Sequence, residues 1–251
     1  MAQIHALPLR KPSPASAAVL HRASDPCANC TARSLTICAS LNSEEQARLA
    51  DHATTVCLQP HQMLFQEGDN AEHVYNVTCG SLSVSKSLAD GRRQITGFLG
   101  PGDFLGLNTR STYTLSAEAL TDTRVCRFPR QQFQRLIAET PPLEHRLLAL
   151  AEGELATAQE QILLLGRKTA MERIASFLLL QSERCQARGM PANPISLPMT
   201  RAEVADYLGL TIETVSRCFT KLRKLDVIGL LAADRVQIKQ PEKLKALSEA
   251  A

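Results

Sequence analysis

The stretch 140–167 (TPPLEHRLLALAEGELATAQEQILLLGR) constrains this chain more than any other part of the sequence. It predicts one long helix, because Thr140 can cap the helix and Pro141 then occupies the first helical position, where a missing N–H costs nothing. Apolar residues recur in it at alternating steps of three and four, the a/d pattern of a parallel coiled coil. The same pattern also fits a core helix packed on its own domain. The residues of this predicted dimer seam are Leu148, Ala151, Leu155, Ala158, Ile162 and Leu165.

Two members of the predicted seam are small. Ala151 and Ala158 bury little area, and because burial of apolar surface stabilises by ~25 cal/mol per Å², this seam is weaker than one of leucine and isoleucine. A marginal dimer is what a regulatory switch needs.

Length, charge and hydropathy narrow the class of protein. A chain of 251 residues favours two domains, and a net charge of +3 argues neither for nor against a nucleic-acid partner. No long apolar run is present, so no membrane span is predicted. Residues 1–24 contain basic side chains but no continuous apolar core, which predicts the disordered arm of a cytoplasmic protein and not a signal peptide.

The eight cysteines of a cytoplasmic chain are not expected to form a disulfide framework. Cys27 and Cys30 form a C-x2-C pair, and Cys38 follows after seven further residues. Three thiolates this close can bind one metal centre, and a fourth supplied from a distant position suits an iron–sulfur cluster better than a tetrahedral zinc site. A thiol redox pair and three small buried hydrophobic residues remain alternatives.

Residues 57–127 have the pattern of a small antiparallel β structure. Short alternating runs are separated by Gly and Pro turns, among which Asp90-Gly91 is the strongest hairpin signal. Strands at this spacing predict a β-barrel or a jelly roll. No catalytic constellation accompanies them, because His61 and His73 stand alone beside turns and are expected at the surface.

Two shorter helices are predicted outside the β region and the long helix. One covers 41–56, where Asn42 or Ser43 can act as the cap, and the other covers 168–188 with an apolar face. The Gly and Pro residues of 189–198 then break the chain and predict a domain boundary.

Beyond that boundary the sequence predicts a helix-turn-helix. The capping box Thr200–Glu203 starts a helix that runs to about Leu208, and Gly209 supplies the turn. Thr211 caps a second helix that runs to about Leu225. The alternating stretch that follows, LLAADRVQIK, predicts a β-hairpin wing.

The second helix of this motif has two different faces. The residues expected to pack inward are Ile212, Val215, Phe219 and Leu222. The opposite face has the chemistry of major-groove recognition, because Arg can donate twice to guanine and Glu can accept from cytosine. An ordinary solvated helix face is the alternative. The residues expected to contact bases or phosphates are Thr200, Arg201, Thr211, Glu213, Ser216, Arg217 and Lys221, with Arg223 and Lys224 as further phosphate contacts.

The order of these parts resembles the CRP/FNR superfamily of bacterial transcription regulators. The C-x2-C-x7-C spacing and ETVSR in the second helix narrow the resemblance to the FNR group, the oxygen-sensing regulators of the fumarate and nitrate reductase type. The resemblance covers about residues 25–245 and includes RRQITGFLGPGDFLGL, TDTRVCRFPR and QILLLGRKTAMERIASFL. It implies an α+β fold with an N-terminal β-roll (jelly-roll, cyclic-nucleotide-binding-like) sensor domain, a long coiled-coil dimerisation helix and a C-terminal winged helix-turn-helix. The implied parts are a disordered arm (1–24), the cysteine segment with the β-roll (25–139), the dimerisation helix (140–167) and the DNA-binding domain (168–251).

In that family, three N-terminal cysteines and one central cysteine hold an oxygen-labile 4Fe–4S cluster. The resemblance therefore implies one cluster per subunit on Cys27, Cys30, Cys38 and Cys126, the last of which lies in TRVCRF. Many members have five residues between the second and third cysteine where this chain has seven, and the longer spacing resembles a variant within the group. The cysteines that match no ligand position are Cys57, Cys79, Cys185 and Cys218, of which the first two are expected to be buried strand thiols.

The resemblance also implies partners. Glu213, Ser216 and Arg217 would recognise the TTGAT-type half-sites of a palindrome, bound by a homodimer under anaerobic conditions. The hairpin at 89–93 would contact RNA polymerase. The cyclic-nucleotide binders of the superfamily carry a Gly-Glu turn and an Arg-Ser pair, whereas this chain has GDFLGL and TLSAEAL, so cyclic AMP binding is not expected.

Two other functions are alternatives to this one. The same DNA-binding regulator could sense redox state through a thiol–disulfide switch or a haem. A metal-dependent enzyme with an accessory helix-turn-helix has no support, because no His, Asp or Glu set accompanies the cysteines.

Overall fold

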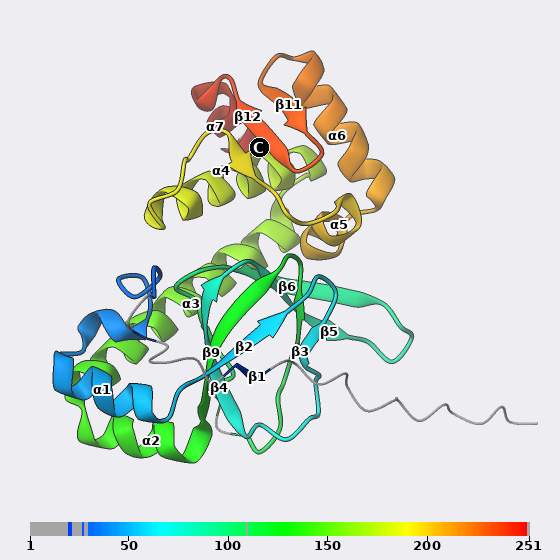
Figure 1. The fold of residues 1–251 in the computed structure, drawn as a ribbon. Coiled ribbons are helices and arrows are strands. Elements are labelled where there is room, and N and C mark those ends of the chain that lie inside the picture. Colours follow the sequence, from blue (N-terminus) through cyan, green and yellow to red (C-terminus); the bar gives the residue numbers. More distant parts are fainter. Residues whose placement is uncertain (1–19, 22–26, 28–29, 109, 250–251) are drawn as a thin grey trace, which may run out of the picture.

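The computed structural model describes residues 20–21, 27, 30–108 and 110–249. They form three parts in chain order: a β-roll with flanking short helices, one long helix, and a C-terminal domain of helices and a small sheet (Figure 1). No helix in the described part of the chain is long and apolar enough to cross a membrane. Of the predicted disordered arm, only Leu20–His21 is described; the rest lies outside the described residues.

The β-roll consists of two antiparallel sheets packed face to face. The five-stranded sheet has the order β1-β2-β9-β4-β7, and the four-stranded sheet has the order β3-β8-β5-β6. Its strands are β1 (Leu20–His21), β2 (Thr54–Leu58), β3 (Met63–Phe65), β4 (His73–Cys79), β5 (Leu82–Ser87), β6 (Arg93–Leu99), β7 (Phe104–Leu105), β8 (Ser116–Ala119) and β9 (Thr123–Pro129). This confirms the predicted jelly roll, and Asp90-Gly91 lies in the β5–β6 hairpin as expected.

Successive side chains along the strands point to opposite faces of the sheet and pack into two separate apolar cores. Val125 of β9 belongs to the core between the two sheets, which we call the inner cluster. Phe128 of the same strand belongs to a second core on the other face of the five-stranded sheet, which we call the outer cluster. The fully or nearly fully buried members of the outer cluster are Ile37, Leu49, Val74, Phe128, Phe133, Leu136, Leu143 and Leu147.

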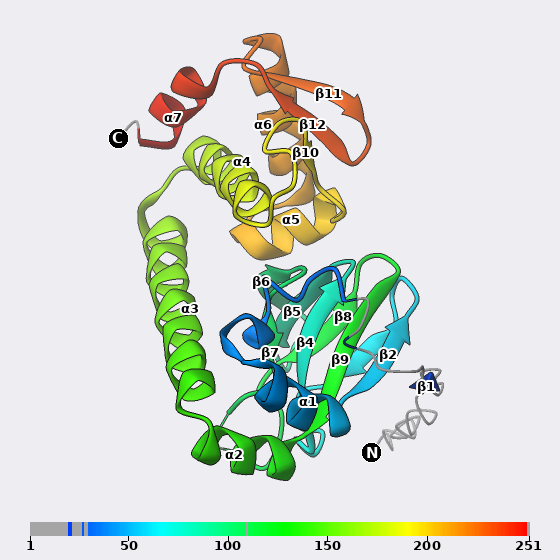
Figure 2. The ribbon, with the colours of Figure 1, turned by 60° about the vertical axis from the view of Figure 1, so that its left-hand side comes forward.

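The outer cluster is covered by helices that precede and follow the roll. They are the 3-10 helix η1 (Ile37–Ser40), α1 (Ser43–Asp51), α2 (Arg130–Glu139) and the first half of α3 (Pro141–Arg167). Figure 2 shows α3 running along one side of the molecule, from α2 at one end of the roll to the C-terminal domain at the other. The chain therefore joins its N-terminal segment, its sheet and its long helix in a single core.

Two details of the predicted helices were wrong. The helix expected over 41–56 ends at Asp51, because the β-branched residues that follow pair with β9 as part of β2. The long helix has the predicted extent, but Thr140 does not cap it with its side chain. Pro142 has no N–H to offer at the second helical position, and the N–H of Leu143 donates to the backbone carbonyl of Thr140.

The C-terminal domain has the predicted helix-turn-helix and wing. Its elements are α4 (Ala170–Ala187), β10 (Ile195–Ser196), α5 (Arg201–Leu208), α6 (Ile212–Lys224), β11 (Ile228–Ala232), β12 (Arg235–Ile238) and α7 (Pro241–Glu249). Thr200 and Glu203 form the expected reciprocal capping box at the start of α5. Gly209 ends that helix in the left-handed region at φ 61°, a conformation that glycine adopts without strain.

Strand β6 of the roll packs directly against the C-terminal domain. The ring of Phe98 lies 6.2 Å from that of Phe177 and 5.1 Å from that of Tyr207, measured between centroids. The Arg188 guanidinium donates to the Asp103 carboxylate at 2.5 Å across the same boundary. These contacts fix the direction in which the helix-turn-helix faces relative to the roll.

Truncation of Leu143 tests the outer cluster. Leu143 is fully buried, so Leu143→Ala should leave a cavity and lower the free energy of unfolding by about 2–5 kcal/mol, measured by urea denaturation. Leu88→Ala is the matched control, because Leu88 is 52% exposed in the β5–β6 hairpin and its truncation should change stability by less than about 0.5 kcal/mol. Equal losses in the two variants would contradict the outer cluster.

Candidate cysteine site and nucleic-acid interface

The segment 30–41, which we call the cysteine segment, is fixed between the roll and α3. The hydroxyl of Thr36 accepts a hydrogen bond from the Cys38 backbone N–H at 3.3 Å and so caps η1. Ile37 is fully buried in the outer cluster. From α3, Arg146 donates to the backbone carbonyl of Leu35 at 3.3 Å. The cysteine segment, which contains Cys30 and Cys38, is thus packed against the first half of α3.

Cys126 faces the same region from the sheet. In the strand register it lies between Thr55 of β2 and Asn76 of β4. Its side chain is partly buried against the outer cluster, as is that of Cys38. The structure therefore brings the third N-terminal cysteine and the central cysteine to one apolar surface, although they are far apart in the sequence.

The thiols of this region act on one another electrostatically. Burial raises the pKa of Cys126 to about 12, and the neighbouring thiols of Cys30, Cys27 and Cys38 also raise that pKa. Burial likewise raises the pKa of Cys38, while a hydrogen bond with Thr36 lowers it. Cys38 and Cys126 therefore share the outer cluster, and Cys27 and Cys30 lie near enough to act on Cys126.

The donor chemistry of this site fits iron. Soft thiolates are the ligands of iron–sulfur clusters, and a bound cation stabilises the deprotonated form that burial disfavours. Within the described residues, however, no group of three or more His, Cys, Asp or Glu side chains is arranged closely enough to hold a metal ion. The four thiols are gathered in one region without forming a closed set of ligands.

The other cysteines lie elsewhere. Cys57 of β2 and Cys79 of β4 both pair with Arg124 of β9, one on each side of it. Both thiols are partly exposed, so the prediction that they are buried was wrong: they point to the outer face, at an end of the strands. Cys185 and Cys218 are buried in the C-terminal domain.

The predicted dimer seam lies on an exposed face of α3. Leu148, Leu155 and Ile162 are 59%, 60% and 72% exposed, and Ala151 and Ala158 are exposed between them. The seam therefore does not serve as a core face of its own domain along most of its length. Its last member departs from this pattern, because Leu165 is half-buried against the core of the C-terminal domain.

Helix α6 buries one face and exposes the other. Val215, Phe219 and Leu222 are buried as predicted, whereas Ile212 is 48% exposed and was placed wrongly. At about 100° per residue, the centre of the buried face lies between Cys218 and Phe219, so Cys218 completes that face and Ile212 falls at its margin in the first turn.

The exposed face of α6 carries most of the predicted DNA contacts. Glu213, Ser216, Arg217 and Lys221 are exposed there, and the Thr211 hydroxyl caps the helix by accepting from the Thr214 N–H at 3.3 Å. A backbone hydrogen bond at the start of the helix, together with the Thr211 hydroxyl, lowers the pKa of Glu213. The outer strip of α6 therefore combines one carboxylate with several cations and hydroxyls.

The first two residues predicted to contact DNA have structural contacts of their own. The Thr200 hydroxyl donates to the Glu203 carboxylate at 2.9 Å, within the capping box. The Arg201 guanidinium lies 3.5 Å from the centre of the Phe219 ring and is half-buried. Thr200 thus caps α5, and Arg201 packs on Phe219 of α6.

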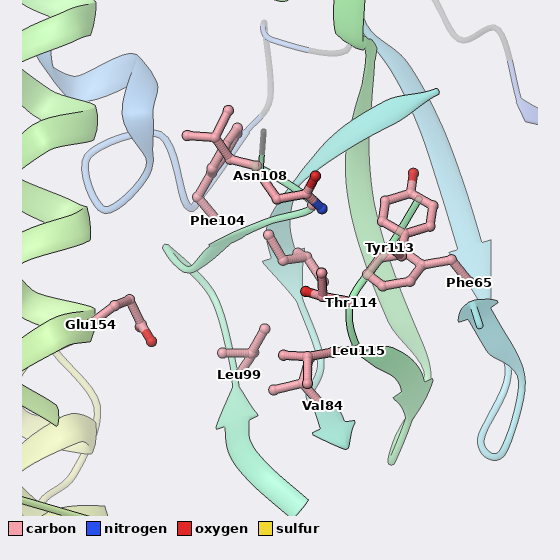
Figure 3. Close-up of a pocket in the computed structure, with 12 residues that line it drawn as sticks. Phe65, Val84, Leu99, Phe104, Asn108, Tyr113, Thr114, Leu115 and Glu154 are labelled. Atoms are coloured by element: carbon pink, nitrogen blue, oxygen red, sulfur yellow. The ribbon is translucent and has the colours of Figure 1, made fainter. Parts of the chain in front are cut away.

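A cavity of about 230 Å³ opens between the roll and α3 (Figure 3). Leu99, Phe104, Tyr113 and other mostly apolar side chains line it, with Asn108 and Glu154 among the polar residues. None of these described lining residues is Lys or Arg, so a phosphate would find no cation here. The prediction that cyclic AMP does not bind stays a prediction.

Comparison with known proteins gave matches over most of the chain. Residues 55–140 match the family model of the cyclic nucleotide-binding domain, and residues 172–247 match that of the Crp-like helix-turn-helix domain. The chain is 40% identical to the nitrogen fixation regulation protein FixK of Bradyrhizobium diazoefficiens, over 89% of this chain and 94% of that protein. It is 39% identical to the transcriptional activator protein FnrL of Cereibacter sphaeroides, over 84% and 86% of the two chains.

A solved structure shares the same architecture. The structure of FixK2 from Bradyrhizobium japonicum superposes with a TM-score of 0.74 at 38% identity, covering 79% of this chain and 98% of that chain. The similarity therefore extends over the roll, the long helix and the helix-turn-helix together.

Proposed function

Because the chain belongs to the CRP/FNR family of DNA-binding transcription regulators, we propose that it regulates transcription in response to oxygen through a 4Fe–4S cluster. Its ligands would be Cys27, Cys30, Cys38 and Cys126. The observation that supports this proposal is that Cys38 and Cys126 pack on one core with the first half of α3, while Cys27 and Cys30 act electrostatically on Cys126. Relatives of the chain are named as transcriptional activators, which favours activation as the response.

When bound, the cluster would be the group that reacts with oxygen. The protein chain would connect that reaction to DNA binding. Cys38 and Cys126 pack on the outer cluster together with Leu143 and Leu147 of α3. Arg146 adds a hydrogen bond from the same helix to the cysteine segment. A shift of the cysteine segment would therefore disturb contacts made by the first half of the predicted dimerisation helix.

We infer that a second copy of the chain covers the exposed apolar strip of α3. Leu148, Leu155 and Ile162 would form the seam, with Ala151 and Ala158 as its weak positions. A modest change in the free energy of pairing then changes DNA occupancy strongly, because a monomer loses the contact with the second half-site.

The dimer would present two α6 helices to successive major grooves, ~34 Å apart. Glu213, Ser216 and Arg217 would read base edges of a TTGAT-type palindrome, and Lys221 would contact phosphate. The exposed β5–β6 hairpin around Asp90-Gly91 is a candidate contact for RNA polymerase.

One observation favours a second candidate sensor. The Cys30 N–H donates to the Cys27 carbonyl at 3.4 Å, so the two residues share one turn. A Cys27–Cys30 disulfide switch could therefore control the same DNA-binding domain without iron.

Removal of Cys126 distinguishes the two sensors. Anaerobically purified Cys126→Ala should lose iron and sulfide, and its DNA affinity should no longer differ between anaerobic and aerobic buffer. Cys57→Ala, which removes a thiol from the neighbouring strand β2, should keep both properties of the parent chain. A Cys126→Ala variant that still responds to air would favour the disulfide switch, and an iron-free parent chain would exclude the cluster.

Arg217→Ala tests the reading of bases. Loss of the bidentate hydrogen bond to guanine should weaken binding to the TTGAT palindrome by about 1–3 kcal/mol and relax the sequence preference at one base pair. Both effects can be measured by fluorescence anisotropy. Arg223→Ala, on the last turn of the same helix, should weaken binding evenly across sequences and reduce the salt dependence. Unchanged sequence preference in Arg217→Ala would contradict this role.

Ala158→Leu tests the weak seam. A larger side chain at this exposed position should raise the dimer fraction in air and reduce the oxygen response, measured by sedimentation and DNA binding. Ala149→Leu is the matched control, because Ala149 is exposed on the same helix but outside the a/d pattern. If Ala158→Leu left both the dimer fraction and the oxygen response unchanged, the seam would not be the point of control.

A further inference from the structure

Asn76 is a buried polar residue at the edge of the cysteine site. It is 1% exposed, and its side-chain oxygen Oδ1 has no hydrogen-bond partner among the described residues. In the strand register it lies between Cys126 of β9 and Phe104 of β7. A buried amide oxygen without a hydrogen-bond partner lowers the stability of the fold.

The alternation of β4 shows which way the side chain of Asn76 faces. Tyr75 and Val77 belong to the inner cluster, whereas Val74 belongs to the outer cluster. Asn76 therefore faces the outer side, as do its neighbours Cys126 and Phe104, which both pack against the outer cluster. The unpartnered amide thus lies on the face that carries the cysteines.

Asn76 is also close enough to act on Cys126. Residues directly opposite one another in an antiparallel pair have Cβ atoms ~4.5–5.5 Å apart, within reach of an amide on one side chain and a sulfur on the other. A primary amide presents an acceptor at one end and two N–H donors at the other, and a half-turn of the side chain exchanges them. With the amide turned, an N–H donor takes the place of Oδ1, on the face of the sheet that carries Cys126.

We propose that Asn76 is a positioning residue of the cysteine site, whose amide donates a hydrogen bond to the sulfur of Cys126 when that sulfur binds iron. The inference rests on the proposed 4Fe–4S site and adds a residue outside the set of ligands. Hydrogen bonds to ligating sulfurs are one of the means by which proteins set the stability and potential of iron–sulfur clusters. The amide of Asn76 thereby gains in the iron-bound chain a hydrogen bond that it does not make in the iron-free chain.

Asn76→Leu separates this role from a merely structural one, because leucine has a similar volume and no polar atom. In the iron-free full-length chain the variant should melt at the same or a higher temperature than the parent, since an orphaned polar group is removed. After anaerobic reconstitution it should lose iron to a chelator ~10-fold more readily, and the midpoint potential of its cluster should be more negative.

Ser83→Ala is the matched control. Ser83 is also 1% exposed with an unpartnered hydroxyl, but it lies on β5 in the other sheet of the roll. Its replacement should alter the melting temperature of the iron-free chain and leave iron retention and the midpoint potential at the values of the parent.

The outcomes separate the inference from the proposed function. Equal iron retention and equal potential in Asn76→Leu and the parent chain would overturn the role of Asn76 while leaving the cluster in place. A fall in both iron retention and iron-free melting temperature would assign Asn76 a structural role and overturn the inference. A parent chain that takes up no iron would overturn the proposed function itself, and this inference with it.

Discussion

The outer cluster is the contact on which the rest of this molecule depends. It joins Ile37 of the cysteine segment, Phe128 of the sheet and Leu143 of the long helix in one apolar core. Burial of one large apolar side chain stabilises by about 1.5–3 kcal/mol, and the cysteine segment contributes the fully buried Ile37 and the partly buried Cys38 and Leu41 to this core. The cysteine segment is therefore attached to this core by few side chains.

The long helix connects this core to the DNA-binding domain. Its 27 residues span about 40 Å, with Leu143 and Leu147 buried near one end and Leu164 near the other. The roll also holds the C-terminal domain directly, through Phe98 and through the Arg93–Asp206 ion pair. Because both ends of α3 are anchored, its exposed middle is the part that can respond to pairing without disturbing either core.

Features set by neighbouring residues were predictable from the sequence, and features set by the fold were not. The capping box Thr200–Glu203 was predicted because all its atoms lie within one turn. The cap at Thr140 failed because Pro142 has no N–H and the Leu143 N–H bonds the backbone carbonyl of Thr140 instead of its side chain. The meeting of Cys38 with Cys126 could be expected only through family resemblance, since spacing carries no information across the intervening strands. Asn76 had no signal at all, because only the register of β4 on β9 makes it a neighbour of Cys126.

The alternation of a single strand places the cysteine site on the side of the sheet away from the inner cluster. Val125 of β9 packs into the inner cluster, and the next residue, Cys126, packs against the outer cluster beside the long helix. A shift of one residue in the register would exchange the two faces and bury the thiol between the sheets. On the face where it lies, Cys126 shares one apolar core with Leu143 of α3. The proposed signal from the cysteines would therefore have a direct contact with the helix that carries the predicted dimer seam.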